Sequence, residues 1–194
     1  MIIAALLVFR RAEVIEALIK RELEGKKIVF VGNIEKCANI KEYVEHLQKC
    51  GTDVVFFHLT DQNVSFTSFG DIFFDAVLYD NRTSETPNTK NLAKRLHSKS
   101  VVISNGDDSV IPDFIEGMKS CIITYGLGSK CSLTPSSIDD SEGLCFNLSV
   151  QRQFVTLCGG SVAIGEFKVE FEDEHINIYD ALAIWAFKLL LEPG

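Results

Sequence analysis

Short apolar segments alternate with segments of helical period through the first two thirds of this sequence, and the alternation limits the folds that the chain can adopt. Apolar runs such as Asp53–Leu59 and Phe73–Tyr79 are continuous, which is typical of strands buried on both faces. Ala12–Leu23 and Asn39–Cys50 instead repeat apolar residues at the spacing of one helix face. The pattern predicts an α/β fold with a mainly parallel sheet and helices on both faces.

The predicted elements follow one another without a linker or a repeat up to Tyr125, as strand and helix in turn. The predicted strands are Ile2–Phe9, Lys27–Val31, Asp53–Leu59, Phe73–Tyr79, Ser100–Ser104 and Cys121–Tyr125, and the further predicted helices are Thr89–Leu96 and Val110–Met118.

The last third of the chain has a different pattern. Leu144–Val150, Gln153–Cys158 and Val162–Phe171 are strand-like, glycines mark the turns, and no helical segment separates them. They predict a small antiparallel β appendage near residues 144–171. An apolar helix over Ile178–Leu191 then follows.

Length and composition place the chain among single globular domains. It has 194 residues, 46% of them hydrophobic and 24% charged, so we expect one domain over residues 1–194. A net charge of −8 disfavours nucleic acid or an anionic membrane as partner. No apolar run is long enough to span a bilayer, and Met1–Phe9 lacks the preceding basic residues of a signal peptide. The six cysteines form no C-x-x-C pair and fit reduced thiols, so we expect a cytoplasmic protein.

Four motifs occur in a fixed order along the chain. Val101–Gly126 runs from a strand through N-G-D-D and a helix to a strand ending in T-Y-G, and Asn177–Ala183 (NIYDALA) precedes the last helix. Thr52–Gln62 and Asp75–Asn81 are strands with polar ends. This set resembles the central, ATP-binding domain of the Mur ligase family, whose motifs are N-A-D-D, T-[YF]-G, H-N-x-x-N-A-L-A-A, E-x-S-S and T-N. Members of that family join amino acids to the peptidoglycan precursor.

The first strand-to-helix turn departs from the pattern of that family. Its members have G-T-N-G-K-T-T there, in which glycine N–H groups contact phosphate, a lysine neutralises charge and a hydroxyl holds Mg²⁺. Here only Phe9, Arg10 and Arg11 separate the predicted strand and helix. Arg10 and Arg11 either attract an anion at the start of the helix or are solvated charges at a strand end. We interpret the phosphate-binding loop as lost.

The positions that meet Mg²⁺ in the family differ as well. The strand-end glutamate of the family corresponds to His58, and imidazole suits Zn²⁺ or Cu²⁺ better than Mg²⁺. After Asn81 the family has D-H, whereas this chain has Arg82-Thr83-Ser84-Glu85. Lys90 and Lys94 are the two lysines near the place of the family's modified lysine, but the spacing is shortened and we assign the role to neither. We predict no metal site, and His58 and Asn81 remain candidates for a crevice at the strand ends.

The side that meets the adenine base in the family is better retained. The resemblance implies nucleotide contacts for Asn105, Asp107, Asp108 and Asn177, which match the family motifs residue by residue. The alternative is that the first three form an ordinary turn, in which an aspartate caps the helix that follows.

Changes at several parts of one site favour a Mur ligase-like domain that has lost ATP-dependent ligase catalysis. The sequence then predicts no catalytic residue and no resident cofactor. The role would be binding or regulation in peptidoglycan metabolism, with another cell-wall protein or a second copy of the chain as partner. One alternative is an amide ligase or ATPase that uses ATP and Mg²⁺ at an atypical phosphate site. Another is a binder of a non-nucleotide small ligand in the crevice at the strand ends.

Overall fold

A computed structural model describes residues 1–8, 12–32, 39–59, 69, 71–80, 92–108, 120–141, 143–171 and 176–192. These residues belong to two compact units. The first comprises Met1–Val102 and Val110–Cys121, and the second comprises Ile103–Ser109 and Ile122–Gly194. The strand β5 (Leu96–Asn105) contributes to both. The single domain predicted for residues 1–194 stays a prediction.

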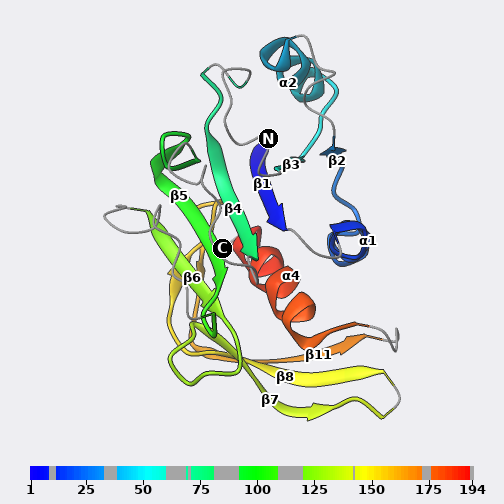
Figure 1. Cartoon of the computed structure of the whole chain (residues 1–194), viewed down its shortest axis with the longest axis vertical. Helices are drawn as coiled ribbons and strands as arrows, with labels where there is room; N and C mark the ends of the chain where they lie inside the picture. Colours follow the sequence, from blue (N-terminus) through cyan, green and yellow to red (C-terminus); the bar gives the residue numbers. More distant parts are fainter. Residues whose placement is uncertain are drawn as a thin grey trace. The chain divides into compact units, whose positions relative to one another are not determined.

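The first unit is built on a parallel sheet (Figure 1). Its central strand β1 (Ile2–Val8) pairs in parallel with β3 (Val54–His58) on one side and with β4 (Phe74–Asp80) on the other. The sheet continues from β3 to β2 (Ile28–Val31) and from β4 to β5, giving the strand order β5-β4-β1-β3-β2. The predicted parallel sheet is therefore confirmed.

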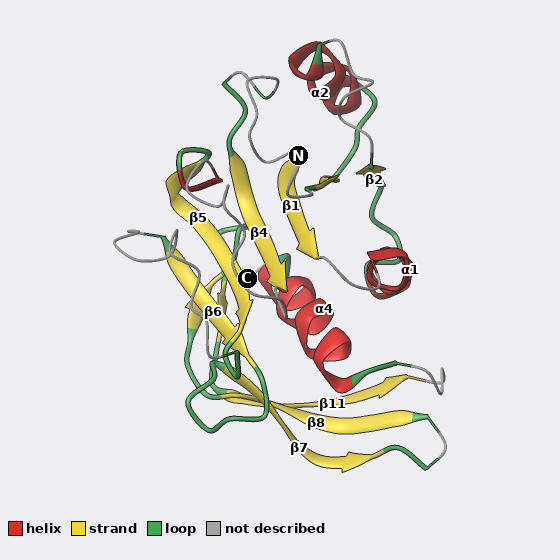
Figure 2. Ribbon diagram, viewed as in Figure 1, coloured by secondary structure: helices red, strands yellow, loops and turns green. Residues whose placement is uncertain are grey.

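Two helices of this unit are drawn in Figure 2, and their buried residues are apolar ones that the sequence predicts to face inward. α1 (Ala12–Glu22) follows β1, and α2 (Ile40–Lys49) follows β2. Asn39 caps α2, because its side-chain oxygen accepts a hydrogen bond from the Glu42 N–H at 3.3 Å. The buried residues are Ile15, Leu18 and Ile19 of α1 and Ile40, Val44 and Leu47 of α2.

An aromatic cluster lies in the core of the first unit. The rings of Phe57 and Phe69 are 5.4 Å apart, and those of Phe69 and Phe74 are 5.3 Å apart, both edge to face. Such a pair adds about 0.5 to 1.5 kcal/mol beyond the burial of its surface. The cluster therefore ties the segment before β4 to the strands β3 and β4.

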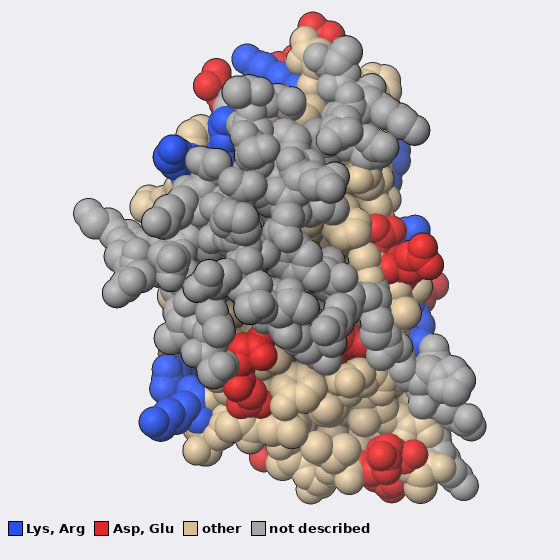
Figure 3. Space-filling model, in the orientation of Figure 1, with Lys and Arg blue, Asp and Glu red and all other residues tan. Residues whose placement is uncertain are grey.

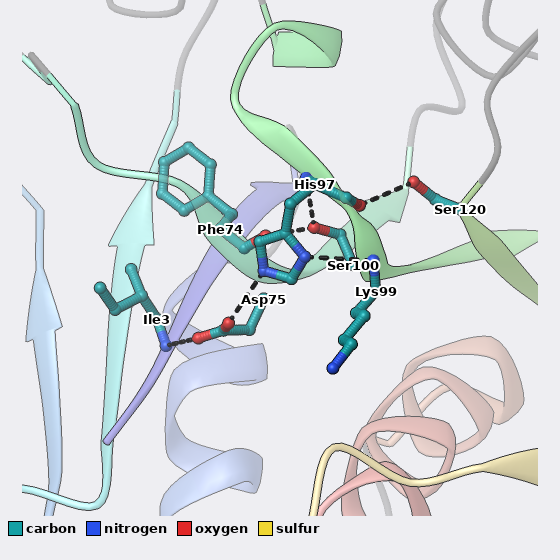
Figure 4. Close-up of polar contacts among 7 residues, drawn as sticks. All are labelled: Ile3, Phe74, Asp75, His97, Lys99, Ser100 and Ser120. Atoms are coloured by element: carbon teal, nitrogen blue, oxygen red, sulfur yellow. Dashed lines mark hydrogen bonds and ion pairs between the residues drawn. The ribbon is translucent and has the colours of Figure 1, made fainter.

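Polar contacts at Asp75 join three strands at their N-terminal ends (Figure 4). Oδ2 of Asp75 accepts a hydrogen bond from the Ile3 N–H in β1 at 2.8 Å, and Oδ1 lies 3.2 Å from Nε2 of His97 in β5. The Ser100 hydroxyl, also in β5, donates to the Phe74 carbonyl at 2.7 Å and accepts from the His97 N–H at 2.8 Å. One carboxylate and one hydroxyl thus fix the start of β1, β4 and β5.

The second unit contains an antiparallel group of strands, as predicted for residues 144–171. β8 (Leu144–Val150) pairs antiparallel with β7 (Leu133–Asp139) and with β11 (Gly165–Phe171), and Figure 1 shows the three side by side. Alternate residues of β8 are buried, which is the pattern of a strand with one face on a core.

The predicted helix at the end of the chain is α4 (Ile178–Leu190), which packs against β7. Most of its residues are buried, including Ala181, Leu182 and Phe187. A helix that is apolar on all sides belongs in an interior. Among the helices that the structure describes, none is long and apolar enough to cross a membrane.

The start of β5 differs from the prediction. β5 begins at Leu96 rather than at Ser100, and the helix predicted up to Leu96 gives way to a turn at Lys94 and Arg95. After Leu96, the next three residues of β5 (His97, Ser98 and Lys99) are polar and at least partly exposed, so the start of β5 has no apolar pattern of a strand. Their place is decided by the contacts of His97 and Ser100 with β4. The predicted helix Val110–Met118 lies outside the described residues.

The sequence does not predict the strand β7 (Leu133–Asp139), because its residues lack the regular alternation of a strand. Pro135 lies within it, Ser137 has a φ of 53°, and the pairing with β8 shifts register between Ser136 and Asp139. Such a bulge breaks the alternation by which a strand is recognised.

The middle strand predicted for the appendage is wrong in extent and in place. Gln153–Cys158 contains only the short β9 (Phe154–Val155), which pairs with β10 (Ser161–Val162) in a separate sheet of two strands. β8 therefore pairs with β11 directly, without β9 between them.

We expect Asp75→Ala to lower the free energy of unfolding by about 1 to 3 kcal/mol, because it leaves the Ile3 N–H and the His97 ring without their acceptor. Urea unfolding followed by circular dichroism measures the change. Asp71→Ala is the matched control, since Asp71 is exposed, and it should stay within about 0.5 kcal/mol of the unchanged chain. Equal effects of the two substitutions would contradict the role of Asp75.

Candidate functional site

The strands of the first unit end at a common edge. Leu6 lies opposite His58 and Val8 lies opposite Asp80, so the carboxyl ends of β1, β3 and β4 meet there. Ligands of open parallel sheets bind outside this edge. His58 is the last residue of β3 and is half-buried, and its place in a crevice stays a prediction.

The connection between β1 and α1 is short. β1 ends at Val8 and α1 begins at Ala12, so three residues separate them. Among these are Arg10 and Arg11, which lie outside the described residues. Asn81 and Lys90 lie outside them too, and the predictions for all four stay predictions.

The second unit holds a compact polar site around Asp107, two residues after the end of β5. Oδ2 of Asp107 accepts a hydrogen bond from the Leu127 N–H at 2.5 Å, and Oδ1 accepts one from the Gly128 N–H at 2.9 Å. The Tyr179 hydroxyl, in the first turn of α4, donates to Oδ2 at 3.2 Å. A single carboxylate therefore joins the end of β5, the loop after β6 (Cys121–Tyr125) and the start of α4.

Two glycines let the loop after β6 come this close to the carboxylate. A Cβ atom on Gly126 would lie 2.6 Å from Oδ2 of Asp107, and one on Gly128 would lie 2.7 Å from Oδ1. Cβ atoms essentially never approach another heavy atom within 3.0 Å. A side chain at either position would therefore push the loop away from Asp107.

The two asparagines predicted for the site have backbone partners. Oδ1 of Asn105, a buried residue at the end of β5, accepts a hydrogen bond from the Asp107 N–H at 3.0 Å. Oδ1 of Asn177 accepts from the Tyr179 N–H at 2.8 Å and caps α4. The structure thus brings Asn105, Asp107 and Asn177 into one site, where Tyr179 links the last two. Asp108 follows directly and is half-buried.

Sequence reasoning missed Tyr179, Gly128 and Cys131 as parts of this site. The available signal was the sequence T-Y-G-L-G, in which two glycines follow a strand at a spacing of two. Glycines so placed mark a close approach of the backbone to another group. That the other group is Asp107 depends on the fold.

The thiol of Cys131 lies beside the same carboxylate, with Sγ 3.8 Å from Oδ1 of Asp107. Burial raises the pKa of the Cys131 thiol above its ordinary value, and the negative charge of Asp107 raises it further. Cys131 is therefore held in its protonated form by its surroundings.

Charged side chains are dispersed on the face that Figure 3 shows. The described Lys and Arg residues lie there in several separate groups, and Asp and Glu residues lie between these groups. A nucleic-acid surface gathers basic side chains into one patch. The absence of a nucleic-acid partner stays a prediction for this chain.

Comparison with solved structures identifies the fold as that of the Mur ligases. A UDP-N-acetylmuramoyl-L-alanyl-D-glutamate–2,6-diaminopimelate ligase superposes with a TM-score of 0.69 and 15% identity over 96% of this chain and 42% of its own. MurF from Acinetobacter baumannii superposes with a TM-score of 0.64 and 14% sequence identity, over 100% of this chain and 46% of its own. The murein peptide ligase mpl from Psychrobacter arcticus 273-4 superposes with a TM-score of 0.58 and 12% sequence identity, over 97% of this chain and 44% of its own.

The chain spans less than half the length of each of these ligases. No protein-family model matches it, and no curated protein matches its sequence. At identities of 12 to 15% the likeness is one of fold. The Mur ligase fold, predicted from four short motifs, is thus supported by the three-dimensional structure.

We expect Gly128→Ala to lower the free energy of unfolding by about 1 to 3 kcal/mol, because the added methyl group meets Asp107. The same substitution should have a smaller effect in a chain that carries Asp107→Ala, since the opposing carboxylate is gone. Urea unfolding of the four members of this cycle gives the interaction energy. Gly165→Ala is the control, because nothing lies within 4 Å of a Cβ atom there. Additive effects of Gly128→Ala and Asp107→Ala would contradict the close approach.

We expect iodoacetamide to modify Cys131 much more slowly than the exposed Cys158 at mildly alkaline pH, because burial and the raised pKa keep the Cys131 thiol protonated. Asp107→Ala removes the nearby negative charge and loosens the loop, so the rate at Cys131 should rise while that at Cys158 stays the same. Peptide mass spectrometry measures both rates in one sample. A rate at Cys131 that Asp107→Ala leaves unchanged would show that Asp107 does not protect this thiol.

Proposed function

We propose that this chain is a Mur ligase-like domain without ATP-dependent ligase catalysis, which acts by binding in cell-wall peptidoglycan metabolism in the cytoplasm. The likeness to three solved ligases covers 96 to 100% of the chain, and it supports the link to this class of protein. The absence of catalysis is inferred from the residues at the strand ends.

The observation that carries this inference is the connection between β1 and α1. A phosphate-binding loop of the form G-x-x-x-x-G-K-[ST] needs about eight residues, whose glycines present N–H groups to the phosphates. Between Val8 and Ala12 there are three residues, and none is a glycine, a lysine, a serine or a threonine. Two arginines supply positive charge but neither the backbone cradle nor the hydroxyl for Mg²⁺.

The state of Asp107 supports the same inference. Its carboxylate oxygens accept hydrogen bonds from two backbone N–H groups and one hydroxyl of its own unit. Asn105 and Asn177 are engaged with the backbone through their side-chain oxygens. These residues hold strand ends and a helix start together, a structural task that survives the loss of a nucleotide. We propose that the inherited turn is kept for stability.

A binding role needs a partner, and we propose a second copy of the chain or another enzyme of cell-wall synthesis. Sedimentation of the purified chain, alone and mixed with a purified diaminopimelate-adding ligase, separates these cases. We expect a dimer in the first case and a mixed complex in the second. A chain that remains monomeric in both samples would contradict the binding role.

We expect no micromolar binding of Mg-ATP in calorimetry and no release of ADP. The three residues between Val8 and Ala12 include no glycine that could build a loop of N–H donors for the phosphates, and His58 stands where the family has a glutamate that holds Mg²⁺. If Mg-ATP binds and turns over, the proposal fails and the alternative of an atypical ligase or ATPase holds. A chain with Arg10→Ala and Arg11→Ala is the matched variant, since that alternative places the phosphates at these arginines. A thermal-shift screen of other metabolites tests the third reading, a non-nucleotide ligand in the strand-end crevice.

A further inference from the structure

The last turn of α2 places an imidazole and a thiol next to each other on the surface. His46 and Cys50 are four residues apart and therefore face the same side of the helix. Nε2 of His46 lies 3.5 Å from Sγ of Cys50, both residues are exposed, and Cys50 forms no disulfide. Neither residue belongs to the sites described above, and this helix lies wholly within the first unit.

The separation of the two atoms is that of two ligands on one zinc ion. Zinc binds thiolate sulfur at about 2.3 Å and imidazole nitrogen at about 2.0 to 2.1 Å, so a tetrahedral ion places the two donors about 3.6 Å apart. The observed 3.5 Å fits this separation without a change of the helix. We propose that His46 and Cys50 chelate one zinc-class divalent ion per chain.

The position of the pair on the helix also favours a cation. Cys50 is the C-cap of α2, and the carboxyl end of a helix carries a partial negative charge. The Lys27 ammonium donates to the Cys50 carbonyl at 2.6 Å and opposes a second positive charge nearby. The two effects act against each other, and we expect binding of moderate strength that exchanges with solution.

The pair supplies two of the four ligands of a tetrahedral zinc ion, which leaves two positions open to water or to another ligand. Among the residues that the structure describes, no third histidine, cysteine, aspartate or glutamate joins the pair. A structural zinc site is closed by four protein ligands, whereas a site with open positions can exchange its ion or accept another ligand. The chelate of His46 and Cys50 supplies two protein ligands, so it leaves more positions open than either kind of site and its ion exchanges readily.

Titration of the full chain with Cd²⁺ tests the site, because a cadmium–thiolate bond gives a charge-transfer absorption in the ultraviolet. We expect one ion bound per chain with moderate affinity, whose absorption is lost with Cys50→Ser. With His46→Gln the affinity should fall by more than about tenfold, since even the outer partners of metal ligands contribute about 10 to 100-fold. Zn²⁺ should raise the melting temperature of the unchanged chain and of neither variant.

Cys121→Ser is the control for cadmium on an unrelated thiol, because Cys121 is exposed and lies on β6. This variant should still bind one ion per chain with the affinity of the unchanged chain. Three results would each overturn the proposal: an ion retained with Cys50→Ser, unchanged affinity with His46→Gln, or one ion per two chains. Circular dichroism confirms that each variant is folded, and none of these outcomes depends on whether the chain binds ATP.

Discussion

The pairing of β1 on both of its sides is the interaction on which the first unit depends. β3 and β4 flank this strand in parallel, and Ala4 and Ala5 at its centre are fully buried. In a strand paired on both sides, the backbone N–H and C=O groups bond to the two neighbouring strands. Without β1, both β3 and β4 would lose these hydrogen bonds and the sheet would be divided. The carboxylate of Asp75 fixes the same strand at its first residues.

The second unit has an equivalent point of connection in Asp107. It joins a strand end, a glycine loop and the start of α4, three segments far apart in the sequence. In both units the connecting group is an aspartate whose oxygens bind backbone N–H groups. This arrangement explains how the chain keeps its polar turns although no glycine lies between β1 and α1: hydrogen bonds within the chain itself hold these turns.

Much of the fold could be predicted from apolar periodicity. The strands β1, β3 and β4 and the helices α1, α2 and α4 lie where the sequence places them, because their buried faces repeat at the period of each element. β7 and the start of β5 could not be predicted. Pro135 and a bulge interrupt β7, and the polar residues His97, Ser98 and Lys99 follow the first residue of β5. Only pairing with neighbouring strands therefore makes these segments strands.

The sequence by itself determined the α/β class, the place of the polar turns at strand ends, and the absence of glycine between β1 and α1. Only the tertiary structure decided what these turns do. From the sequence alone, the N-G-D-D turn could belong either to a nucleotide site or to hydrogen bonds within the chain, since both need aspartates after a strand. The choice of partner for Asp107 depends on which backbone N–H groups the fold brings within 3 Å of it. Spacing along the chain fixes local structure, whereas contacts between distant segments depend on packing that a sequence does not express.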